Sequence, residues 1–319
     1  MTTEFGLTLS CEEHDPRTLV DNASKAEQAG FDFVSISDHF HPWLDEQGHS
    51  AFVWSVLGAI AERTATIRVG VGVTCPIMRI HPAILAQATA TTSHLLGDRF
   101  SWGVGTGEAL NEHILGNKWP IAPTRLAMLD EAVALIRELW SGESVTFDGE
   151  FYTVENARIY DAPEHEIPIV VSAFGPKAAE LSADIGDGLW MSGFSADTIS
   201  TWRDCGGTGS IWSQIDVCWA DDETTALDTV ERVWRSSGVP GQLSQDLPTP
   251  HHFDQAASIV RREDLADKII CGPDADRIIE QAEAAIDAGV DHVYFHQIGP
   301  DQQAFLDIWQ STLRHRLGT

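Results

Sequence analysis

Short apolar runs alternate along the chain with longer segments whose apolar positions recur at helical spacing. Runs of the first kind predict buried parallel strands, and segments of the second kind predict amphipathic helices. The predicted strands cover residues 5–9, 31–36, 67–73, 100–104, 167–172, 188–191, 211–219 and 290–296. The predicted helices cover 16–29, 51–64, 82–96, 124–140, 274–288 and 302–316, and a further one begins at residue 176. About eight strand units separated by helices predict an α/β fold, a (β/α)8 TIM barrel.

Two segments depart from this alternation. Residues 143–157 contain two short β-like runs around Asp148-Gly149, which is a hairpin signal. Residues 195–260 are interrupted by Gly206-Gly207, Pro240-Gly241 and Pro248-Thr249-Pro250, and they predict two helices besides the strand at 211–219. We therefore predict a single barrel domain over residues 1–319, with a hairpin insertion at 143–157 and a variable segment at 195–260.

Polar residues and glycines follow the second, third and fourth predicted strands. Because the carboxyl ends of barrel strands meet at one mouth, these three segments are predicted to converge on a common site. The glycines let the backbone approach a ligand closely, and Glu108 and Asn111 can face the same ligand from one helical turn. The competing interpretation is a tight loop in which Glu108 merely favours the start of a helix. The segments read Ser37-Asp38-His39-Phe40-His41-Pro42-Trp43, Gly72-Val73-Thr74-Cys75-Pro76 and Gly105-Thr106-Gly107-Glu108-Ala109-Leu110-Asn111-Glu112.

The residue best suited to proton transfer in these segments is His39, because imidazole titrates near neutral pH. Asp38 precedes it directly, and neighbours on an extended segment point to opposite faces, so the two do not by themselves predict a catalytic pair. A hydrogen-bonded structural histidine is the competing interpretation for His39. Core packing is the default role for Trp43, since the chain has 11 Trp residues.

His39 and His41 also resemble the paired ligands of metal-dependent hydrolase barrels. A site of that kind needs further metal ligands at later strand ends. The fifth and sixth strand ends instead read Ser172-Ala173-Phe174-Gly175 and Met191-Ser192-Gly193. We therefore predict no metal site and keep the hydrolase as a minor alternative.

Charge narrows the classes of partner. The formal net charge is −28, with 48 acidic and 20 basic residues, so phosphate-rich nucleic acids and anionic membranes are predicted to be repelled. Lys occurs only at positions 25, 118, 177 and 268. Such a carboxylate-rich, Lys-poor chain suggests a halophilic protein, because concentrated salt screens the repulsion between its carboxylates.

The cysteines and the first residues of the chain indicate in which cellular compartment the protein is expected. The five cysteines form no C-x-x-C pair and their number is odd, so the sequence predicts neither a disulfide framework nor a Cys-rich zinc site. The first residues lack the basic and apolar regions of a signal peptide, and no apolar run approaches a membrane span. We expect a soluble, cytoplasmic protein with a small-molecule substrate.

Three motifs together resemble the luciferase-like superfamily, and within it the group typified by coenzyme F420-dependent glucose-6-phosphate dehydrogenase. The first two are the segments beginning at Ser37 and Gly105. The third joins Leu139-Trp140-Ser141-Gly142 to Phe147-Asp148-Gly149 and Tyr152. The likeness runs from Gly6 to the final helix and is thinner over 195–260. It implies a barrel with insertions, a homodimer, and a deazaflavin cofactor that carries a hydride.

The resemblance also implies residue roles. Those implied to be catalytic are His39 as a base toward the substrate hydroxyl, Trp43 lining the reacting face, Glu108 handling the cofactor proton, and Glu12 after the first strand. The implied cofactor contacts are Asp38, Cys75, Asn111, Ser192, a non-prolyl cis peptide at Gly72-Val73, and the segment Phe174-Gly175-Pro176 near the cofactor's phosphate, with Lys177 beside it. A helix N-terminus at that segment can meet an anion.

Departures from the resembled group bear on the substrate. The sugar-phosphate enzymes hold the substrate phosphate with basic residues, whereas the matching stretches here read Ser192-Gly193-Phe194-Ser195, Ala266-Asp267-Lys268 and Val290-Asp291. An anion near Asp267 and Asp291 would be repelled, so a neutral alcohol or unphosphorylated sugar is predicted to fit better than glucose 6-phosphate. An apolar pocket could be lined by Trp190, Phe194, Trp212 and Trp219, of which at least two are expected in the core.

The leading interpretation is thus an F420-dependent oxidoreductase that transfers a hydride between a substrate hydroxyl carbon and the deazaflavin. Its alternatives are an F420-dependent glucose-6-phosphate dehydrogenase, a flavin mononucleotide-dependent monooxygenase of the same superfamily, a metal-dependent hydrolase, and a catalytically silent barrel. The motif that contains Glu108 and Asn111 speaks against the monooxygenase.

Overall fold

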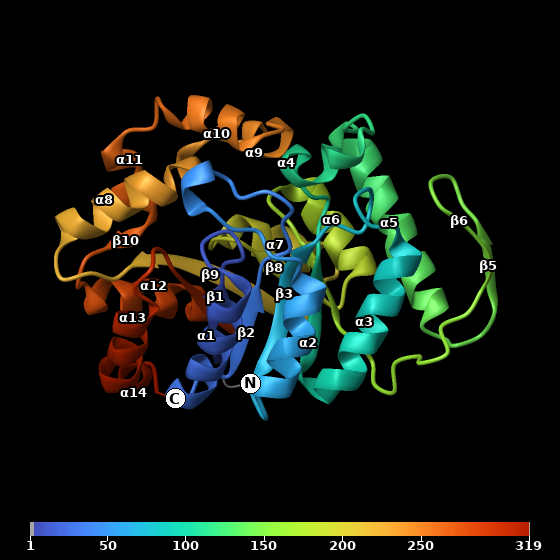
Figure 1. The fold of residues 1–319 in the computed structure, drawn as a ribbon, viewed down its shortest axis with the longest axis horizontal. Coiled ribbons are helices and arrows are strands. Elements are labelled where there is room, and N and C mark those ends of the chain that lie inside the picture. Colours follow the sequence, from blue (N-terminus) through green and yellow to red (C-terminus); the bar gives the residue numbers. More distant parts are fainter. Residues whose placement is uncertain (1–2, 319) are drawn as a thin grey trace.

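Eight parallel strands close into a barrel in the computed structural model, which describes residues 3–318 (Figure 1). Around the ring the order is β9-β11-β1-β2-β3-β4-β7-β8, and pairing of β8 with β9 closes it. A short strand, β10 (Ile270–Cys271), adds to the outer side of β9. The predicted (β/α)8 barrel is therefore confirmed. The barrel strands are β1 (Glu4–Leu9), β2 (Phe33–Ile36), β3 (Arg68–Thr74), β4 (Phe100–Val104), β7 (Ile169–Ser172), β8 (Gly188–Met191), β9 (Ser210–Cys218) and β11 (His292–Gln297).

Helices surround the barrel, and local signals set several of their ends. Asp15 accepts hydrogen bonds from the amides of Arg17 and Thr18 where α1 begins, and Gly30, with φ of +80°, ends that helix. α1 and α3 have the bounds that the sequence predicted. The surrounding helices are α1 (Pro16–Ala29), α2 (Val53–Arg63), α3 (Pro82–Leu96), α5 (Ala122–Leu139), α6 (Pro176–Ile185), α7 (Ala196–Asp204), α12 (Ala275–Asp287), α13 (Gln302–Ile308) and α14 (Arg314–Arg316).

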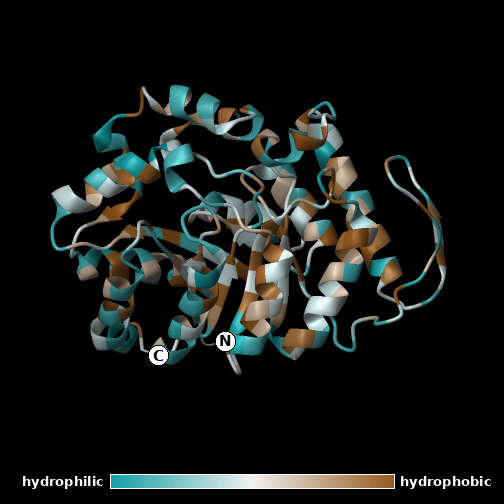
Figure 2. Cartoon of the chain, viewed as in Figure 1, coloured by the Kyte–Doolittle hydropathy of each residue, from teal (hydrophilic) through white to brown (hydrophobic). Residues whose placement is uncertain are grey.

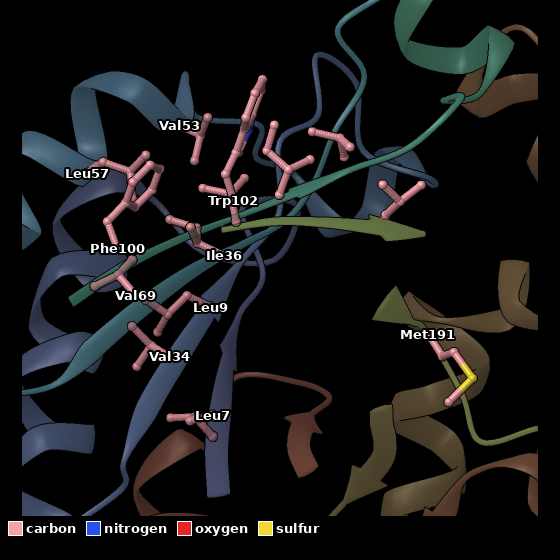
Figure 3. Close-up of a cluster of buried hydrophobic side chains, with 14 of the residues drawn as sticks. Leu7, Leu9, Val34, Ile36, Val53, Leu57, Val69, Phe100, Trp102 and Met191 are labelled. Carbon is pink, nitrogen blue, oxygen red and sulfur yellow. The ribbon is translucent and has the colours of Figure 1, made fainter. Parts of the chain in front are cut away.

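Alternation along the strands divides the core into two layers. Outward-facing residues such as Leu9, Ile36 and Val69 gather against Val53 and Leu57 of α2 (Figure 3). The inward-facing aromatic side chains fill the barrel below its mouth, so the barrel is packed rather than hollow. These interior residues are Phe33, Val170, Trp190, Trp212 and Tyr294. Hydropathy colouring follows the same division, with apolar residues on the strands and polar ones on the outer helix faces (Figure 2).

Two segments lie outside the basic barrel pattern. The strands β5 (Val145–Asp148) and β6 (Thr153–Ala157) pair antiparallel and stand beside α5, away from the barrel (Figure 1). Residues 195–260 were predicted to hold two helices besides one strand. They contain more than two helices, because prolines and glycines divide the segment into short pieces. Over the carboxyl ends of the strands lie α4 (Ala109–Glu112), α8 (Glu223–Val233), α9 (Leu243–Asp246), α10 (Pro250–Ala257) and α11 (Arg262–Lys268).

Within the described residues, no helix combines the length and the apolar character needed to cross a membrane.

Candidate active site

A cavity of about 920 Å³ opens at the carboxyl ends of the barrel strands. Most residues that the sequence singled out line it, although they come from six different strand ends or the loops that follow them. These are Glu12, His39, Trp43, Gly72, Val73, Glu108, Phe174, Gly175, Lys177 and Ser192. The predicted convergence of the strand-end segments is therefore seen in the structure. Asp38, Cys75 and Asn111 are not among the lining residues and lie behind them.

The centre of the cavity wall is an ion pair between His39 and Glu12. His39 Nδ1 lies 2.8 Å from Glu12 Oε1; the Glu12 side chain is buried, and that of His39 keeps 13% of its surface exposed. The hydroxyls of Ser10 and Ser37 each donate to Glu12 Oε2 at 2.8 Å. Burial opposes ionisation of both partners, but their mutual attraction prevails. The ion pair and hydrogen bonds lower the pKa of Glu12 to about 2, and Glu12 together with Glu108 raises the pKa of His39 to about 9.

Trp43 and Glu108 frame the imidazole. The rings of His39 and Trp43 meet edge to face, with centroids 5.1 Å apart. Trp43 in turn packs edge to face against Phe253 of α10, at 5.0 Å, which ties its position to the segment over the mouth. Glu108 directly precedes α4 and faces the cavity. The imidazole thus has a carboxylate on its Nδ1 side, an aromatic neighbour, and a second carboxylate that helps to raise its pKa.

Asp38 points away from His39, into a buried clamp. Asp38 accepts hydrogen bonds from Thr74 Oγ1 at 2.9 Å and from Arg79 Nη2 at 2.8 Å. The same Arg79 donates from its backbone amide and from Nε to Glu112, at 2.8 and 3.3 Å. Burial raises the pKa of Glu112 to about 7, although Arg79 opposes that shift. The clamp joins the loops after β2 and β3 to α4.

Asn111 and Cys75 also position loops. Asn111 Oδ1 accepts from the amides of Phe40 and His41, at 2.8 and 3.0 Å, and so fixes the turn that follows His39. The Cys75 side chain is buried against Gly107, and burial raises its pKa well above the usual value. Direct contact of Asp38, Cys75 and Asn111 with a cofactor stays a prediction; their observed contacts are with the protein.

The wall formed by β3 is made of backbone and small side chains. The Gly72–Val73 peptide bond is cis, as the resemblance implied. A Cβ at Gly72 would collide with the Trp190 ring and lie 2.8 Å from Ser35 Oγ, and one at Gly105 would lie 3.0 Å from Val73 Cγ2. Gly72 therefore has no room for a side chain, a Cβ at Gly105 would be tight against Val73, and the two glycines leave the wall flat.

The mouth beside β7 offers backbone amides and a cation. Gly175 precedes α6, whose first residues are Pro176 and Lys177, and Phe174 is 66% exposed beside them. Nothing lies within 4 Å of the position that a Cβ would take at Gly175. The beginning of α6 is thus accessible to a ligand, and helix N-termini favour anions.

A second buried histidine in the wall escaped the sequence analysis. His296 Nε2 lies 2.7 Å from Glu13 Oε2, and its Nδ1 lies 3.4 Å from Asp216 Oδ1. Burial disfavours the charged imidazole, but bonds to Asp216 and Glu13 raise the pKa of His296 to about 10. Strand alternation could have revealed the site, because Gln214 and Asp216 share the inward face of β9. Further polar and aromatic lining residues that the sequence did not reveal are Thr8, Ser10, Arg125, Gln214, Trp234, Gln242, Ser244 and Gln245.

Several substrate-side predictions were wrong. Asp291 lies at the amino end of β11 and accepts a hydrogen bond from the amide of Ile211, so it is at the opposite end of the barrel from the cavity. Lys268 donates to the carbonyl of Ser237 at 3.2 Å and does not line the cavity. The aromatic residues expected around an apolar pocket are absent from the lining; Trp190 and Trp212 belong to the barrel core. Strand register, which the sequence alone does not give, decides which of these residues reach the mouth of the barrel.

The two histidines of the His-x-His sequence do not converge. His41 Nδ1 lies 2.8 Å from the carbonyl oxygen of Leu110, whereas His39 Nδ1 faces Glu12. Among residues 3–318, no three His, Cys, Asp or Glu side chains are arranged to hold a metal ion. The directions of these two imidazoles do not fit the metal-dependent hydrolase alternative.

Comparison with known proteins agrees with this geometry. Residues 1–292 match the family model described as luciferase-like monooxygenase. The chain is 36% identical to the F420-dependent glucose-6-phosphate dehydrogenases of Segniliparus rotundus and Nocardia farcinica, over 98% of each chain. An F420-dependent secondary alcohol dehydrogenase, solved with an F420–acetone adduct, superposes with a TM-score of 0.91 at 31% identity, covering 98% of this chain and 99% of that one. The chain therefore belongs to the luciferase-like monooxygenase family.

Proposed function

We propose that this protein is a coenzyme F420-dependent oxidoreductase that transfers a hydride between the carbon bearing a substrate hydroxyl and the deazaflavin. The observation that carries the proposal is the meeting of His39, paired with Glu12, and the neighbouring backbone wall of Gly72 and Val73 in a single cavity. Both kinds of close relative are dehydrogenases named for the same cofactor, one acting on glucose 6-phosphate and one on a secondary alcohol.

The residues present fit this cofactor. A planar ring needs a smooth wall, and Gly72 and Gly105 line the cavity without side chains. A cavity of about 920 Å³ is at the upper end of ordinary ligand sites and has room for a tricyclic ring together with a small substrate. The accessible start of α6, with Lys177, suits the phosphate-bearing tail. Asp38, Cys75, Asn111 and Ser192 are proposed as further contacts or supports.

When bound, coenzyme F420 supplies the ring that exchanges a hydride with the substrate carbon. His39 accepts the hydroxyl proton at Nε2 during alcohol oxidation and donates it during carbonyl reduction, since Nδ1 is engaged by Glu12. Glu12 keeps the imidazole oriented, Trp43 confines the substrate beside it, and Glu108 moves the proton on the cofactor side. Proton transfer is thus assigned to His39 on the substrate side and to Glu108 on the cofactor side, and Glu12 orients His39.

We propose that the substrate is a neutral alcohol or unphosphorylated sugar. The Arg and Lys residues that line the cavity are Arg125 and Lys177. The carboxylates of Glu12 and Glu108 face the region where the reaction is proposed to occur. Arg125 Nη2 already donates to Gln245 at 2.7 Å, and Lys177 belongs to the cofactor side of the mouth. A substrate phosphate near His39 would therefore meet carboxylates. The alternative, a glucose-6-phosphate dehydrogenase, requires turnover of that sugar phosphate.

Titration with F420, followed by Trp fluorescence, tests the cofactor; flavin mononucleotide is titrated in parallel, because tighter binding of the flavin would favour the monooxygenase. Steady-state rates with 2-propanol, glucose and glucose 6-phosphate then test the substrate. His39→Ala and Glu108→Ala are expected to retain F420 binding and to lower kcat by about two to four orders of magnitude. The oxidoreductase assignment fails if F420 does not bind or if no alcohol is turned over.

We also propose a homodimer. An apolar groove on the outer surface is lined by Val20 of α1, Ala51, Phe52, and Val56 and Ala59 of α2, and Phe52 is 55% exposed. Light scattering after size exclusion would give the mass, and Phe52→Asp is expected to shift a dimer toward monomer if this groove is the interface. A monomeric wild-type protein would contradict the proposal.

The remaining expectations concern setting and organisation. We propose a cytoplasmic location, which fits free thiols at all five cysteines, of which only Cys205 is exposed. We propose adaptation to concentrated salt on the net charge of −28. We also treat the chain as one barrel domain over 1–319, with 143–157 and 195–260 as its insertion and variable segment; residues 1, 2 and 319 lie outside the described structure.

A further inference from the structure

The cluster around His296 is a polar wall to which the proposed hydride transfer gives no role. His296 is clamped between Glu13 and Asp216, and Glu13 is itself fixed by the amide of Gly299 at 2.8 Å. Gln214 Nε2 donates to Asp216 Oδ1 at 2.6 Å. The Trp234 ring covers the imidazole edge to face, with centroids 4.5 Å apart. Gln214, Trp234 and His296 all line the cavity.

The wall lies across the barrel from the proposed ring site. Going around the ring in one direction, β11, β1 and β2 separate β9 from β3; in the other, β8, β7 and β4 separate them. β9 therefore stands opposite β3, whose Gly72–Val73 peptide forms the flat wall. A ring resting on Gly72–Val73 turns its other face toward β9 and β11. The space between that face and the wall is where a substrate must lie.

The wall offers hydrogen-bond acceptors to this space. Within residues 3–318, the side-chain hydrogen bonds of Asp216 and Gln214 use Oδ1 and Nε2. Asp216 Oδ2 and Gln214 Oε1 remain for a ligand; Gln214 lines the cavity, and Asp216, which is not among the lining residues, keeps 24% of its side-chain surface exposed on the same inward face of β9. Thr8 Oγ1, buried on the neighbouring β1, makes no hydrogen bond within the same residues. His296 orients the acceptors by holding Asp216.

A substrate that meets this wall needs a polar group there. The alkyl part of a monofunctional alcohol would strip water from a carboxylate and an amide without replacing their hydrogen bonds, which is unfavourable. A hydroxyl donor would replace the water. An anionic group would be repelled by Asp216, because its partner His296 is already shared with Glu13.

We infer that Gln214 and Asp216, positioned by His296, bind a second hydroxyl group of the substrate, so that the substrate is a neutral polyol or sugar rather than a monofunctional alcohol. This inference rests on the proposed function and names its substrate class. The reacting hydroxyl lies at His39, and the second hydroxyl donates to the acceptors on β9.

The test compares 1,2-propanediol with 2-propanol, which share a secondary hydroxyl and differ by one further hydroxyl. The wild-type protein is expected to have a kcat/KM at least about tenfold higher for the diol, and to turn over glucose. Asp216→Asn is expected to lower the ratio of the two kcat/KM values by about 10- to 100-fold, as loss of one hydrogen bond to a charged group does, and Gln214→Leu by about 2- to 10-fold, as loss of a neutral one does. The loss should fall mainly on the diol's KM.

Asp291→Asn is the matched control, because Asp291 serves the amino end of β9 and is far from the mouth. It should leave the ratio unchanged. F420 affinity, measured by fluorescence in every variant, should also stay the same. An unchanged ratio of the two kcat/KM values in Asp216→Asn, or a large loss of F420 affinity in that variant, would overturn the inference. Neither result would contradict the proposed oxidoreductase activity. Absence of F420 binding in the wild-type protein would contradict both this inference and the proposed function.

Discussion

At the scale of single residues, the proposed role of His39 predicts opposite pH dependences for the two directions of the reaction, because the ion pair with Glu12 sets the pKa of the imidazole. Glu12 raises the pKa of His39 to about 9, so the imidazole is protonated at neutral pH. A protonated His39 can donate to a carbonyl oxygen but cannot accept a hydroxyl proton. We expect kcat/KM for alcohol oxidation to rise with pH through about 9, and kcat/KM for carbonyl reduction to fall through the same value.

The variant Glu12→Gln tests the cause. It removes the carboxylate that raises the pKa, while burial, which lowers it, remains. The midpoint of both pH profiles should therefore move down by at least one unit, and oxidation at pH 7 should suffer less than reduction. Glu108→Gln serves for comparison, because Glu108 is the smaller of the two influences and should move the midpoint less. Identical midpoints in wild type and Glu12→Gln would contradict the assignment of His39.

The sequence predicted most of the reacting side of the cavity and missed the opposite wall. His39, Trp43 and Glu108 belong to continuous motifs that can be read without strand register. Gln214 and His296 occur singly on strands whose inward face only the register defines. Asp38 was predicted to contact the cofactor because it belongs to a motif. In the structure its side chain points away from the cavity and binds Arg79.

At the scale of elements, Arg79 holds three loops together through Asp38 and Glu112. Replacing it with Met would leave two buried carboxylates without their cation, and loss of one partner of a buried pair costs about 3–5 kcal/mol. We expect Arg79→Met to lower the free energy of unfolding by that amount, measured by urea denaturation. The double variant Arg79→Met, Glu112→Gln should recover part of the loss, because it removes one stranded charge.

Arg63→Met is the control for this experiment. Arg63 lies 3.7 Å from Asp21 with more than half of each side chain exposed, and such pairs contribute at most about 1 kcal/mol. An equal loss of unfolding free energy in Arg79→Met and Arg63→Met would show that the buried clamp stabilises the fold no more than an exposed ion pair does.

The Gly107 turn makes a second prediction about an element. Gly107 has φ of +68°, and a Cβ there would collide with Cys75; Gly116 has φ of +82° and open space around it. Both Ala variants should lose about 1–2 kcal/mol from the left-handed backbone, and Gly107→Ala should lose more, because Cys75 is buried and cannot move away. Urea denaturation of the two variants separates the collision from the backbone effect. Equal losses would contradict the close packing of Gly107 against Cys75.

Element boundaries were predictable where the chain carries its own stop signals. α1 and α3 each begin with a proline and are followed directly by a glycine, and both were predicted to the residue. β11 begins at His292 rather than at 290, and the amide of Val290 still bonds to the carbonyl of Ala285 in α12. The short helices α9 and α10 could not be predicted, since they are held by contacts such as that of Phe253 with Trp43 rather than by their own periodicity.

At the scale of the whole molecule, barrel closure was predictable from the count of strand units, but the cavity needed the three-dimensional ring. The chain order alone does not say that β9 faces β3, or that Glu12 and Glu13, adjacent in sequence, serve histidines on different strands. Closure brings β11 beside β1 and so creates two carboxylate–imidazole pairs in one mouth. The proposed division into a reacting side and a recognition side is a property of the closed barrel.

The net charge of −28 is also a property of the whole molecule, and it makes stability depend on salt. Acidic residues outnumber basic ones by 48 to 20, so repulsion among exposed carboxylates destabilises the folded state at low ionic strength. Raising salt from about 0.01 M to about 1 M shortens the screening length from about 30 Å to about 3 Å. We expect the thermal midpoint of unfolding to rise across this range in KCl, measured by circular dichroism.

Potassium chloride must be compared with sucrose at equal osmolarity, because excluded solutes stabilise folded proteins without screening charge. Screening predicts a steep rise at low KCl that flattens as the screening length falls below the spacing of surface carboxylates, and no matching steep phase in sucrose. The clamp of Arg79 with Asp38 and Glu112 is shielded from solvent, so the difference in stability between wild type and Arg79→Met should change little with salt. A thermal midpoint that is flat or falls with KCl would rule out adaptation to salt, and with it the physical reason for so acidic a surface.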